Sequence, residues 1–318
     1  MRVLSRRLPP FAAAAALAVA CAACGSSQAI SSTASAAASG PGSFPTTVTA
    51  ANGQVHIGSR PTAIISLSPT STEMLYAIGA GGQVRAVDSD SDYPPQAPRT
   101  KLSGFQPNVE AIVGYKPDLV VVDANAGGLI KSLAAFKIPV LELPAATKLS
   151  DVYAQFDELG RATGHLAQAE RENARLRGQL ARIAAAAPHQ AKPLTYYYEL
   201  DQTYYSVTSD TFVGQLLHLL GMKSIADTAT GAAAAGGYPQ LSPEFIIKAN
   251  PDYIILADTL CCHQSAASVA RRPGWSGLTA VKDGHVIALN DDVASRWGPR
   301  ITDLMQTVET AIAKGGGT

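Results

Sequence analysis

Two adjacent cysteines followed by a histidine, Cys261-Cys262-His263, have the most obvious capacity for chemistry in this chain. Zinc sites take ligands at separated spacings, because neighbouring residues do not easily reach one ion together. A cysteine nucleophile would need an orienting base and acid, but the other histidines are scattered along the chain without a pattern. In an oxidising compartment Cys261 and Cys262 could close a vicinal disulfide, and two small buried thiols are the alternative.

Two glutamates are the next candidates, because they occur in similar sequence contexts in the two halves of the chain. "NVEAIVGYKPDLVVV" places Glu110 seven residues before a Pro-Asp pair, and "SPEFIIKANPDYIIL" does the same with Glu244. Both glutamates follow residues typical of helix starts, where the helix dipole alone favours an acidic side chain.

Short apolar strands that alternate with helices must position these residues, and the pattern occurs twice. We expect strands at 63–68, 83–88, 118–123 and 139–144 in the first half, and at 194–200, 252–258 and 284–291 in the second. Helices are expected at 71–80, 109–116, 128–137, 211–221, 243–250 and 298–314. This alternation is typical of parallel sheets with helices on both faces, so the predicted class is α/β with two parallel-sheet lobes.

Residues 149–188 connect the two halves and contain no proline before Pro188. Gly160 and Gly164 indicate a break, so we predict one helix to about Thr163 and a long one to about Ala187. The apolar positions do not hold a heptad, which excludes a coiled-coil arm. The expected domains are a signal peptide (1–23), a flexible tether with a leading strand (24–58), an N-terminal lobe (59–163), a connecting helix (164–188) and a C-terminal lobe (189–314).

The N-terminal segment predicts export. Three arginines precede the apolar run "FAAAAALAVACAAC", which is too short to span a membrane. Because the run ends at Cys24-Gly25-Ser26, it resembles a bacterial lipoprotein signal whose cysteine receives a lipid. Cys24 is the expected acylation site, Cys21 is its competitor, and plain secretion is the alternative. Residues 25–45 are rich in Ser, Ala and Gly and predict a flexible tether.

Composition and glycine patterns exclude several classes of function. The 318 residues carry 25 basic and 25 acidic side chains, so no nucleic-acid partner is expected. An enzyme on this scaffold would need a nucleophile elbow, a phosphate loop or a dinucleotide glycine pattern. The nearest approach, "IGAGGQ" at 78–83, follows a helix and precedes a strand, so it indicates a helix end.

Five motifs carry a resemblance to a known family: "LSPTSTEMLYAIG", "SDYPP", "NVEAIVGYKPDLVVV", "SPEFIIKANPDYIIL" and "WGPRITDL". In this order, from about Arg60 to about Ile312, they resemble the substrate-binding proteins of ABC importers for vitamin B12 and ferric siderophores, with the vitamin B12 branch closest. The resemblance implies two lobes, one rigid connecting helix, little domain closure, no catalysis and no cofactor. It also implies that Glu110 and Glu244 dock onto arginines of an ABC permease dimer that works with ATPase subunits.

Two facing parallel-sheet lobes bring the carboxyl ends of their strands to one shared cleft, where such sheets bind ligands. The expected cleft loops are 68–71, 88–94, 103–105, 123–125, 201–205, 236–238, 261–263 and 291–297. The candidate ligand contacts on them are Ser68, Asp90, Tyr93, Phe105, Tyr204, Tyr205, Tyr238, Arg296 and Trp297.

Some of these contacts carry a more specific expectation. The resemblance puts Phe105 and Tyr238 where the vitamin B12 branch has tryptophans, and Asp90 where it has a tyrosine. Arg296 could hold a carboxylate or phosphate of the ligand. Tyr93 either contacts the ligand or packs under its own Pro94-Pro95 turn, and Trp297 either lines the cleft or caps the core.

The expected function is a lipid-anchored extracytoplasmic protein that captures a metal chelate, either a corrinoid or an iron–siderophore, for an ABC importer. Haem is an alternative ligand and would need an axial residue, for which Tyr205, Tyr238 and His263 are candidates. A bare-metal receptor would need several histidines and carboxylates in the cleft, so no protein-bound metal is expected. An extracytoplasmic enzyme and an adhesion or sensor protein are the rival classes.

Overall fold

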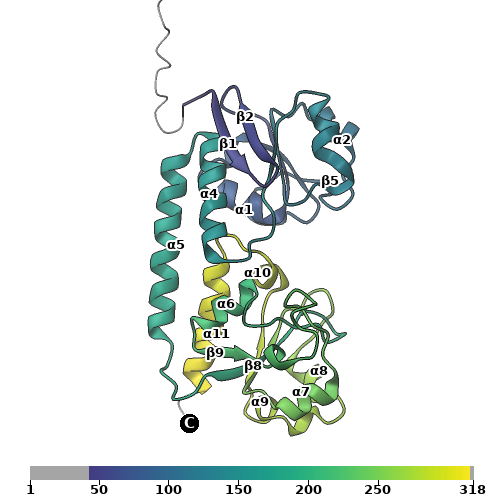
Figure 1. The fold of residues 1–318 in the computed structure, drawn as a ribbon, viewed down its shortest axis with the longest axis vertical. Coiled ribbons are helices and arrows are strands. Elements are labelled where there is room, and N and C mark those ends of the chain that lie inside the picture. Colours follow the sequence, from purple (N-terminus) through teal and green to yellow (C-terminus); the bar gives the residue numbers. More distant parts are fainter. Residues whose placement is uncertain (1–42, 316–318) are drawn as a thin grey trace, which may run out of the picture. The chain divides into compact units, whose positions relative to one another are not determined.

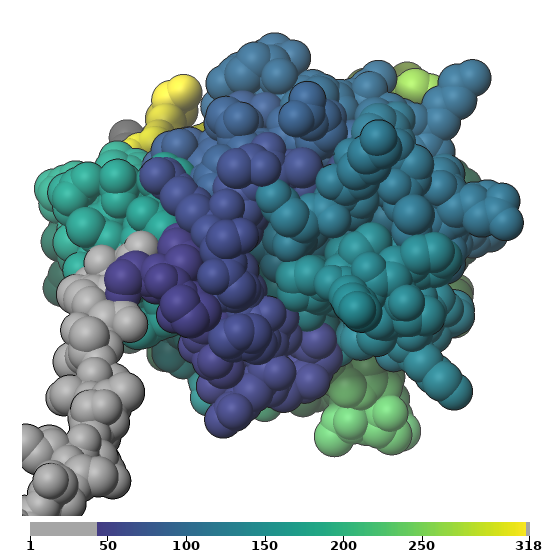
Figure 2. All heavy atoms as spheres, turned by 90° about the horizontal axis from the view of Figure 1, so that it is seen from above, coloured from purple at the N-terminus to yellow at the C-terminus, as the bar shows by residue number. Residues whose placement is uncertain are grey.

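The structure, a computed structural model, describes residues 43–315 (Figure 1). The expected signal peptide, Cys24 and the tether up to residue 42 lie outside the described residues. The described part begins with an antiparallel hairpin of β1 (Thr46–Ala50) and β2 (Gly53–Ile57). In the end-on view of the first lobe, this hairpin is the purple surface (Figure 2).

The first lobe contains a five-stranded sheet in the order β5-β4-β3-β6-β7, with all neighbours parallel. Its strands are β3 (Ile64–Leu67), β4 (Val84–Asp88), β5 (Arg99–Leu102), β6 (Leu119–Val122) and β7 (Val140–Glu142). Its helices include α1 (Pro69–Ala77), α2 (Val109–Gly114) and α3 (Leu129–Ala134). Every residue of β3 and β6 is buried, as expected for parallel strands covered on both faces.

The second lobe contains a four-stranded parallel sheet in the order β11-β10-β8-β9. Its strands are β8 (Leu194–Glu199), β9 (Met222–Ser224), β10 (Tyr253–Leu256) and β11 (Val286–Ala288). Its helices are α6 (Phe212–His218), α7 (Pro243–Ala249), α8 (Ala266–Ala270), α9 (Thr279–Lys282), α10 (Asp291–Ser295) and α11 (Ile301–Gly315). Three consecutive tyrosines of β8, Tyr196, Tyr197 and Tyr198, are buried on the two faces of the sheet.

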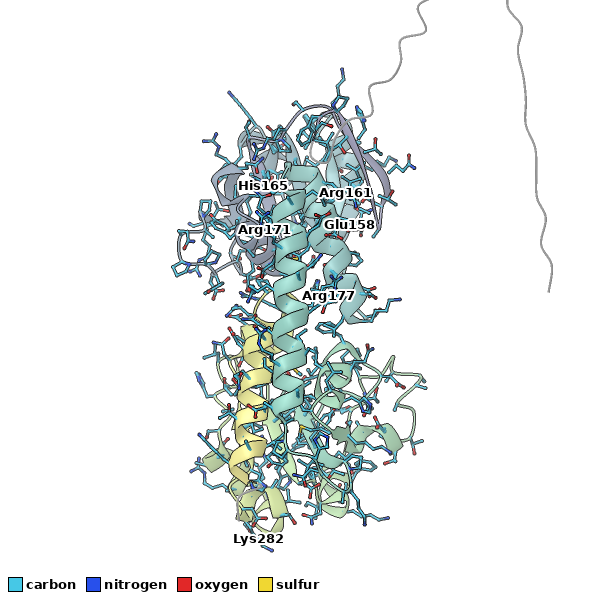
Figure 3. All side chains as sticks on the ribbon, turned by 90° about the vertical axis from the view of Figure 1, so that its left-hand side faces the viewer. Glu158, Arg161, His165, Arg171, Arg177 and Lys282 are labelled. Carbon is cyan, nitrogen blue, oxygen red and sulfur yellow. The ribbon has the colours of Figure 1, made fainter. Side chains whose placement is uncertain are left out.

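Two helices connect the lobes. α4 (Leu149–Thr163) ends at Gly164, which has a φ of 76°, and α5 (Leu166–Ala186) follows. α5 packs against α4 and against α11, and Figure 3 shows it running along both lobes. A Cβ at residue 160 would lie only 2.7 Å from the Cβ of Ala169, so glycine allows α4 and α5 to approach closely.

One hydrophobic core runs through both lobes. It joins Leu119 and Val121 of β6 to Leu176 of α5 and to Tyr198 and Ile255 of the second sheet. Each sheet also has one smaller hydrophobic cluster of its own on the face turned away from this core. Because the lobes share buried side chains, moving one lobe against the other would expose apolar surface.

The predicted α/β class with two parallel-sheet lobes is confirmed. The structure has a hairpin at 46–57 where a single leading strand was expected, and it adds the short edge strands β5 and β9. β5 reads "RTKL" and β9 reads "MKS", so neither is long or apolar enough to give a periodic signal. No helix within residues 43–315 is both long and apolar enough to cross a membrane.

Candidate functional site

A cavity of about 450 Å³ lies between the first lobe and α10 of the second. Every segment around it follows a strand at its carboxyl end, namely β3, β4, β5, β6 and β11. The lining residues are Leu67, Pro69, Thr70, Asp88, Ser89, Asp90, Asp92, Gly104, Phe105, Asp123, Asp292, Ser295, Arg296 and Trp297. This is the edge at which parallel sheets bind ligands.

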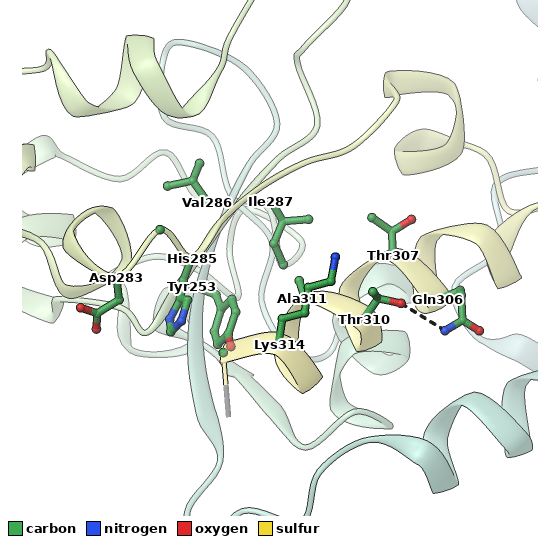
Figure 4. A pocket seen from close by; sticks show the side chains of 12 residues that line it. Tyr253, Asp283, His285, Val286, Ile287, Gln306, Thr307, Thr310, Ala311 and Lys314 are labelled. Atoms are coloured by element: carbon green, nitrogen blue, oxygen red, sulfur yellow. Dashed lines mark hydrogen bonds between the residues drawn. The ribbon is translucent and has the colours of Figure 1, made fainter. Parts of the chain in front are cut away.

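A larger cavity of about 800 Å³ lies between β11 and α11 (Figure 4), and it shares no lining residue with the first cavity. It is bordered by Tyr253, which begins β10, and by Asp283 and His285, which precede β11. It therefore opens at the amino ends of these strands, the edge opposite to the one used for ligands. The cavity between the lobes is the stronger candidate despite its smaller volume.

Gly104 shapes the first-lobe wall of the candidate cavity. A Cβ at this position would lie 2.4 Å from the Leu67 carbonyl oxygen, so any other residue would push the segment away from β3. The close approach brings the following residue, Phe105, to the cavity with 82% of its surface exposed. An apolar ring left this exposed is available to a flat ligand.

Arg296 is engaged by protein acceptors, which changes the expectation that it holds an anionic group of the ligand. Its Nη1 donates to Glu73 Oε1 at 2.9 Å and to Asp92 Oδ1 at 3.0 Å. Its Nη2 donates to Asp292 Oδ1 at 2.6 Å and to the Asp90 carbonyl oxygen at 3.0 Å. The arginine thus joins the second lobe to α1 and to the loop after β4, and a ligand anion would have to displace these carboxylates.

Glu73 is shared between Arg296 and Arg300. The Nε and Nη2 atoms of Arg300 donate to the Glu73 carboxylate at 2.9 and 2.6 Å, which makes a second buried ion pair. The Arg300 guanidinium also lies 4.3 Å from the centre of the Tyr93 ring. Tyr93 therefore borders a different cavity, next to Pro94 and α5, rather than the one between the lobes.

The carboxylates around the cavity have shifted acidities. Burial raises the pKa of Asp88 to about 6 and also raises the pKa of Asp123. For Asp92, burial acts in the same direction, but the hydrogen bond and charge of Arg296 outweigh it and lower the pKa. For Asp292, burial outweighs Arg296, and the pKa is raised.

The structure brings together only part of the predicted contact set. Asp90, Phe105, Arg296 and Trp297 line the cavity, and the Nε1 of Trp297 also donates to Gln155 at 2.8 Å while its ring packs on the core. Trp297 thus borders the cavity on one side and the core on the other, so the alternatives stated for it do not exclude each other.

The other predicted contacts lie elsewhere. Ser68 is buried beside the cavity, where its Oγ caps α1. Tyr204 packs on Trp275, with ring centres 5.9 Å apart, and Tyr205 and Tyr238 are about half exposed without bordering the cavity. The loops 201–205, 236–238 and 261–263 therefore contribute nothing to the cavity lining, and of the second-lobe loops only 291–297 reaches it.

Four of the lining aspartates, Asp88, Asp92, Asp123 and Asp292, were not among the candidate contacts. Their loops were expected at the cleft, and each is an acidic residue at or after the carboxyl end of a strand. Their position at the carboxyl ends of strands could therefore have identified these aspartates. Selecting residues for their aromatic side chains was less successful.

The Cys261–His263 loop is held by Asp291. The backbone N–H groups of Leu260 and Cys261 donate to its carboxylate at 2.9 and 2.8 Å, and the Thr259 hydroxyl donates at 3.0 Å. Cys261 is exposed, Cys262 is half-buried, and both are free thiols. The hydrogen bond with Cys262, burial and the charge of Asp291 raise the pKa of Cys261 to about 12, which disfavours a thiolate nucleophile.

Glu110 and Glu244 occupy equivalent positions on the two lobes. Each lies exposed in the first turn of its helix, α2 or α7, after a capping side chain. Asn108 accepts the Ala111 N–H at 2.9 Å, and Ser242 accepts the Phe245 N–H at 3.1 Å. Among the described residues, neither glutamate has an ion-pair partner, so both carboxylates are accessible to another molecule.

Comparison with known proteins adds independent information. Residues 64–293 match the family described as periplasmic binding protein. An uncharacterised ABC transporter substrate-binding lipoprotein of Bacillus subtilis is 30% identical over 85% of this chain and 86% of its own length. A protein of Halobacterium salinarum named cobalamin-binding protein is 32% identical over 85% of this chain and 74% of its own length.

The fold is also similar to that of solved structures. The periplasmic vitamin B12 binding protein of Vibrio cholerae superimposes with a TM-score of 0.66 at 25% identity, covering 81% of this chain and 98% of that protein. The similarity thus extends over both lobes and the helix between them.

Proposed function

Because the chain belongs to the periplasmic binding protein family, we propose that it is the substrate-binding protein of an ABC importer and captures a metal chelate. The observation that carries this proposal is the cavity at the carboxyl ends of strands from both lobes. Substrate-binding proteins of this kind pass a small molecule to a permease that works with ATPase subunits. The raised pKa of Cys261 argues against an enzyme that would use this thiol as its nucleophile.

A corrinoid is the first candidate ligand and a ferric siderophore the second. Relatives named for cobalamin and vitamin B12 support the corrinoid, as do Phe105 and Trp297, which offer apolar faces to a flat macrocycle. Haem is less well supported, because none of the described residues that line the cavity is a Tyr, His or Met able to act as axial ligand. Tyr205, Tyr238 and His263 lie outside this lining.

We infer that the protein works outside the cytoplasm and is held at the membrane by a lipid on Cys24. The Bacillus subtilis relative is named a lipoprotein, which supports this inference. Metabolic labelling with a radioactive fatty acid tests it: the full-length protein should incorporate label, and a Cys24→Ala variant should not. Label that persists in this variant would move the acylation to Cys21.

The proposed ligand class is tested by fluorescence titration of residues 45–318. Trp297 lines the cavity whereas Trp275 is 1% exposed in the second lobe, so ligand should quench mainly Trp297. Cyanocobalamin, a hydroxamate and a catecholate ferric siderophore, and haemin are titrated side by side with correction for their absorbance. Saturable quenching that disappears in Trp297→Phe supports the proposal. The absence of binding to all four would overturn it.

A further inference from the structure

The charge of the cavity wall is strongly asymmetric. Five aspartates and one arginine line it, and the arginine is already paired with Glu73, Asp92 and Asp292. Within residues 43–315, the remaining aspartates, Asp88, Asp90 and Asp123, have no basic side chain at ion-pair distance. An occupant of the cavity therefore meets uncompensated negative charge.

The three carboxylates differ in how strongly solvent screens them. Asp88 is 2% exposed, and its Oδ1 accepts the Ser91 N–H at 3.0 Å. Burial raises its pKa to about 6, so its negative charge is present in full only above that pH. Asp123 is partly buried and Asp90 is exposed, so Asp88 and Asp123 are screened less than Asp90.

The aspartates are not arranged to hold a bare cation. Among the described residues there is no group of three or more His, Cys, Asp or Glu side chains that could hold a metal ion. Asp88, Asp90 and Asp123 instead follow two different strands, β4 and β6, and face a cavity of about 450 Å³. Their combined negative charge would therefore act on a larger molecule that fills the cavity.

We propose that the cavity selects its chelate by charge, and that it prefers a cationic chelate to a neutral one and a neutral chelate to an anionic one. This inference rests on the proposed function above and narrows it. Ferric catecholates, which are multiply anionic, and haem, which carries two propionates, are disfavoured. Corrinoids without net negative charge and ferric hydroxamates with a free amine are favoured.

The test uses chelates that differ in charge alone. One series is a ferric trihydroxamate whose terminal amine is free, acetylated or succinylated, which makes it cationic, neutral or anionic. The corrinoid pair is cyanocobalamin and the cobalamin with water in place of cyanide, which carries one more positive charge. In whichever series binds, we expect affinity to fall by about tenfold for each step away from positive charge. The difference should shrink as ionic strength rises.

Matched variants test whether Asp88 and Asp123 cause the preference for a cationic chelate. Asp88→Asn and Asp123→Asn keep the side-chain shape and remove the charge, so the preference for the cationic chelate should fall by about threefold to tenfold in each. Glu170→Gln, on the exposed surface of α5, is the control and should change nothing. If Asp88→Asn does not fold, Asp123→Asn carries the test alone, because its side chain is only partly buried.

The outcomes separate the two proposals. If no chelate of any charge binds, the proposed function fails and this inference fails with it. If an anionic chelate binds as tightly as its neutral counterpart, or the Asp→Asn variants leave the ratio unchanged, the function stands and charge selection is overturned.

Discussion

Glu73 is a fully buried carboxylate on α1 that two arginines of the second lobe share. Its side chain is 0% exposed, and those of Arg296 and Arg300 are 8% and 15% exposed. A buried ion pair of this kind contributes little net stability, because burial of the charges costs about as much as their attraction gains. Removal of the carboxylate, however, leaves the arginines buried without a neutralising charge. The ion pair therefore serves mainly to fix how the lobes meet at the cleft.

The Glu73→Gln variant measures this dependence. We expect the free energy of unfolding to fall by about 3 kcal/mol, because Arg300 loses the one carboxylate with which it forms an ion pair within residues 43–315, and its own side chain is only 15% exposed. Urea denaturation followed by circular dichroism gives the value. Glu172→Gln, which removes the partner of the 43% exposed Arg175, should cost less than about 0.5 kcal/mol. Equal losses in the two variants would contradict the structural role of Glu73.

Asp258 provides a second prediction at this scale. Burial first, and then the neighbouring Glu199 carboxylate, raise the pKa of Asp258 to about 7. The folded protein thus binds this proton more tightly than the unfolded chain, whose aspartate pKa is about 4. The stabilisation is complete below pH 4 and is lost as the pH rises towards 7, since the charged form is then forced into the protein.

Asp258→Asn should abolish this part of the pH dependence. Between pH 5 and pH 8 the native protein should lose on the order of 1–2 kcal/mol more stability than the variant. Unfolding free energies at a series of pH values provide the measurement. Parallel curves for the two proteins would show that Asp258 is ionised in the folded state.

At the scale of elements, the long and repetitive features could be predicted from the sequence. The alternation of strands and helices, the break near Gly164 and the cleft loops at strand ends follow from period and turn chemistry. The short helices α8, α9 and α10 could not be predicted, because four or five residues give no periodic signal.

The site was only partly predictable for a related reason. Tyr204 and Tyr205 follow the end of β8, and Tyr238 lies in the loop before α7, yet none of the three borders the cavity. Tyr204 packs on Trp275 instead. Arg296 lies where expected, but its acceptors come from α1 and from the loop after β4. Such long-range pairing has no local sequence signal.

The loop after β10 contains two adjacent cysteines, for which we predict a disulfide. Cys261 and Cys262 are adjacent, and the backbone around Cys261 is held by Asp291, so an oxidising compartment would favour a vicinal disulfide between them. Residues 45–318 contain only the cysteines Cys261 and Cys262. When purified without reductant, this protein should gain no mass on alkylation after denaturation, and two alkyl groups after reduction. Denaturation is required because the raised pKa of Cys261 slows the reaction of the folded thiol. Full labelling without reductant would exclude the disulfide.

At the scale of the whole molecule, the shared core limits what the lobes can do. α5 packs along α4 and α11, and buried side chains of both sheets belong to one cluster (Figure 3). A large closing motion would break this cluster, so the bound and free proteins should present nearly the same outer surface. We therefore expect a membrane partner to recognise fixed positions, for which Glu110 and Glu244 are the candidates.

These two exposed glutamates lead to the last prediction. Glu110→Lys and Glu244→Lys together should leave chelate affinity unchanged, because neither residue borders the cavity. If they bind arginines of the permease, charge reversal should lower ligand-dependent ATPase stimulation of the reconstituted importer by tenfold or more, since like charges then face each other across the contact. The exposed Glu170→Lys on α5 is the charge-matched control. A double variant that stimulates as well as this control would reduce Glu110 and Glu244 to first-turn residues favoured only by their own helix dipoles.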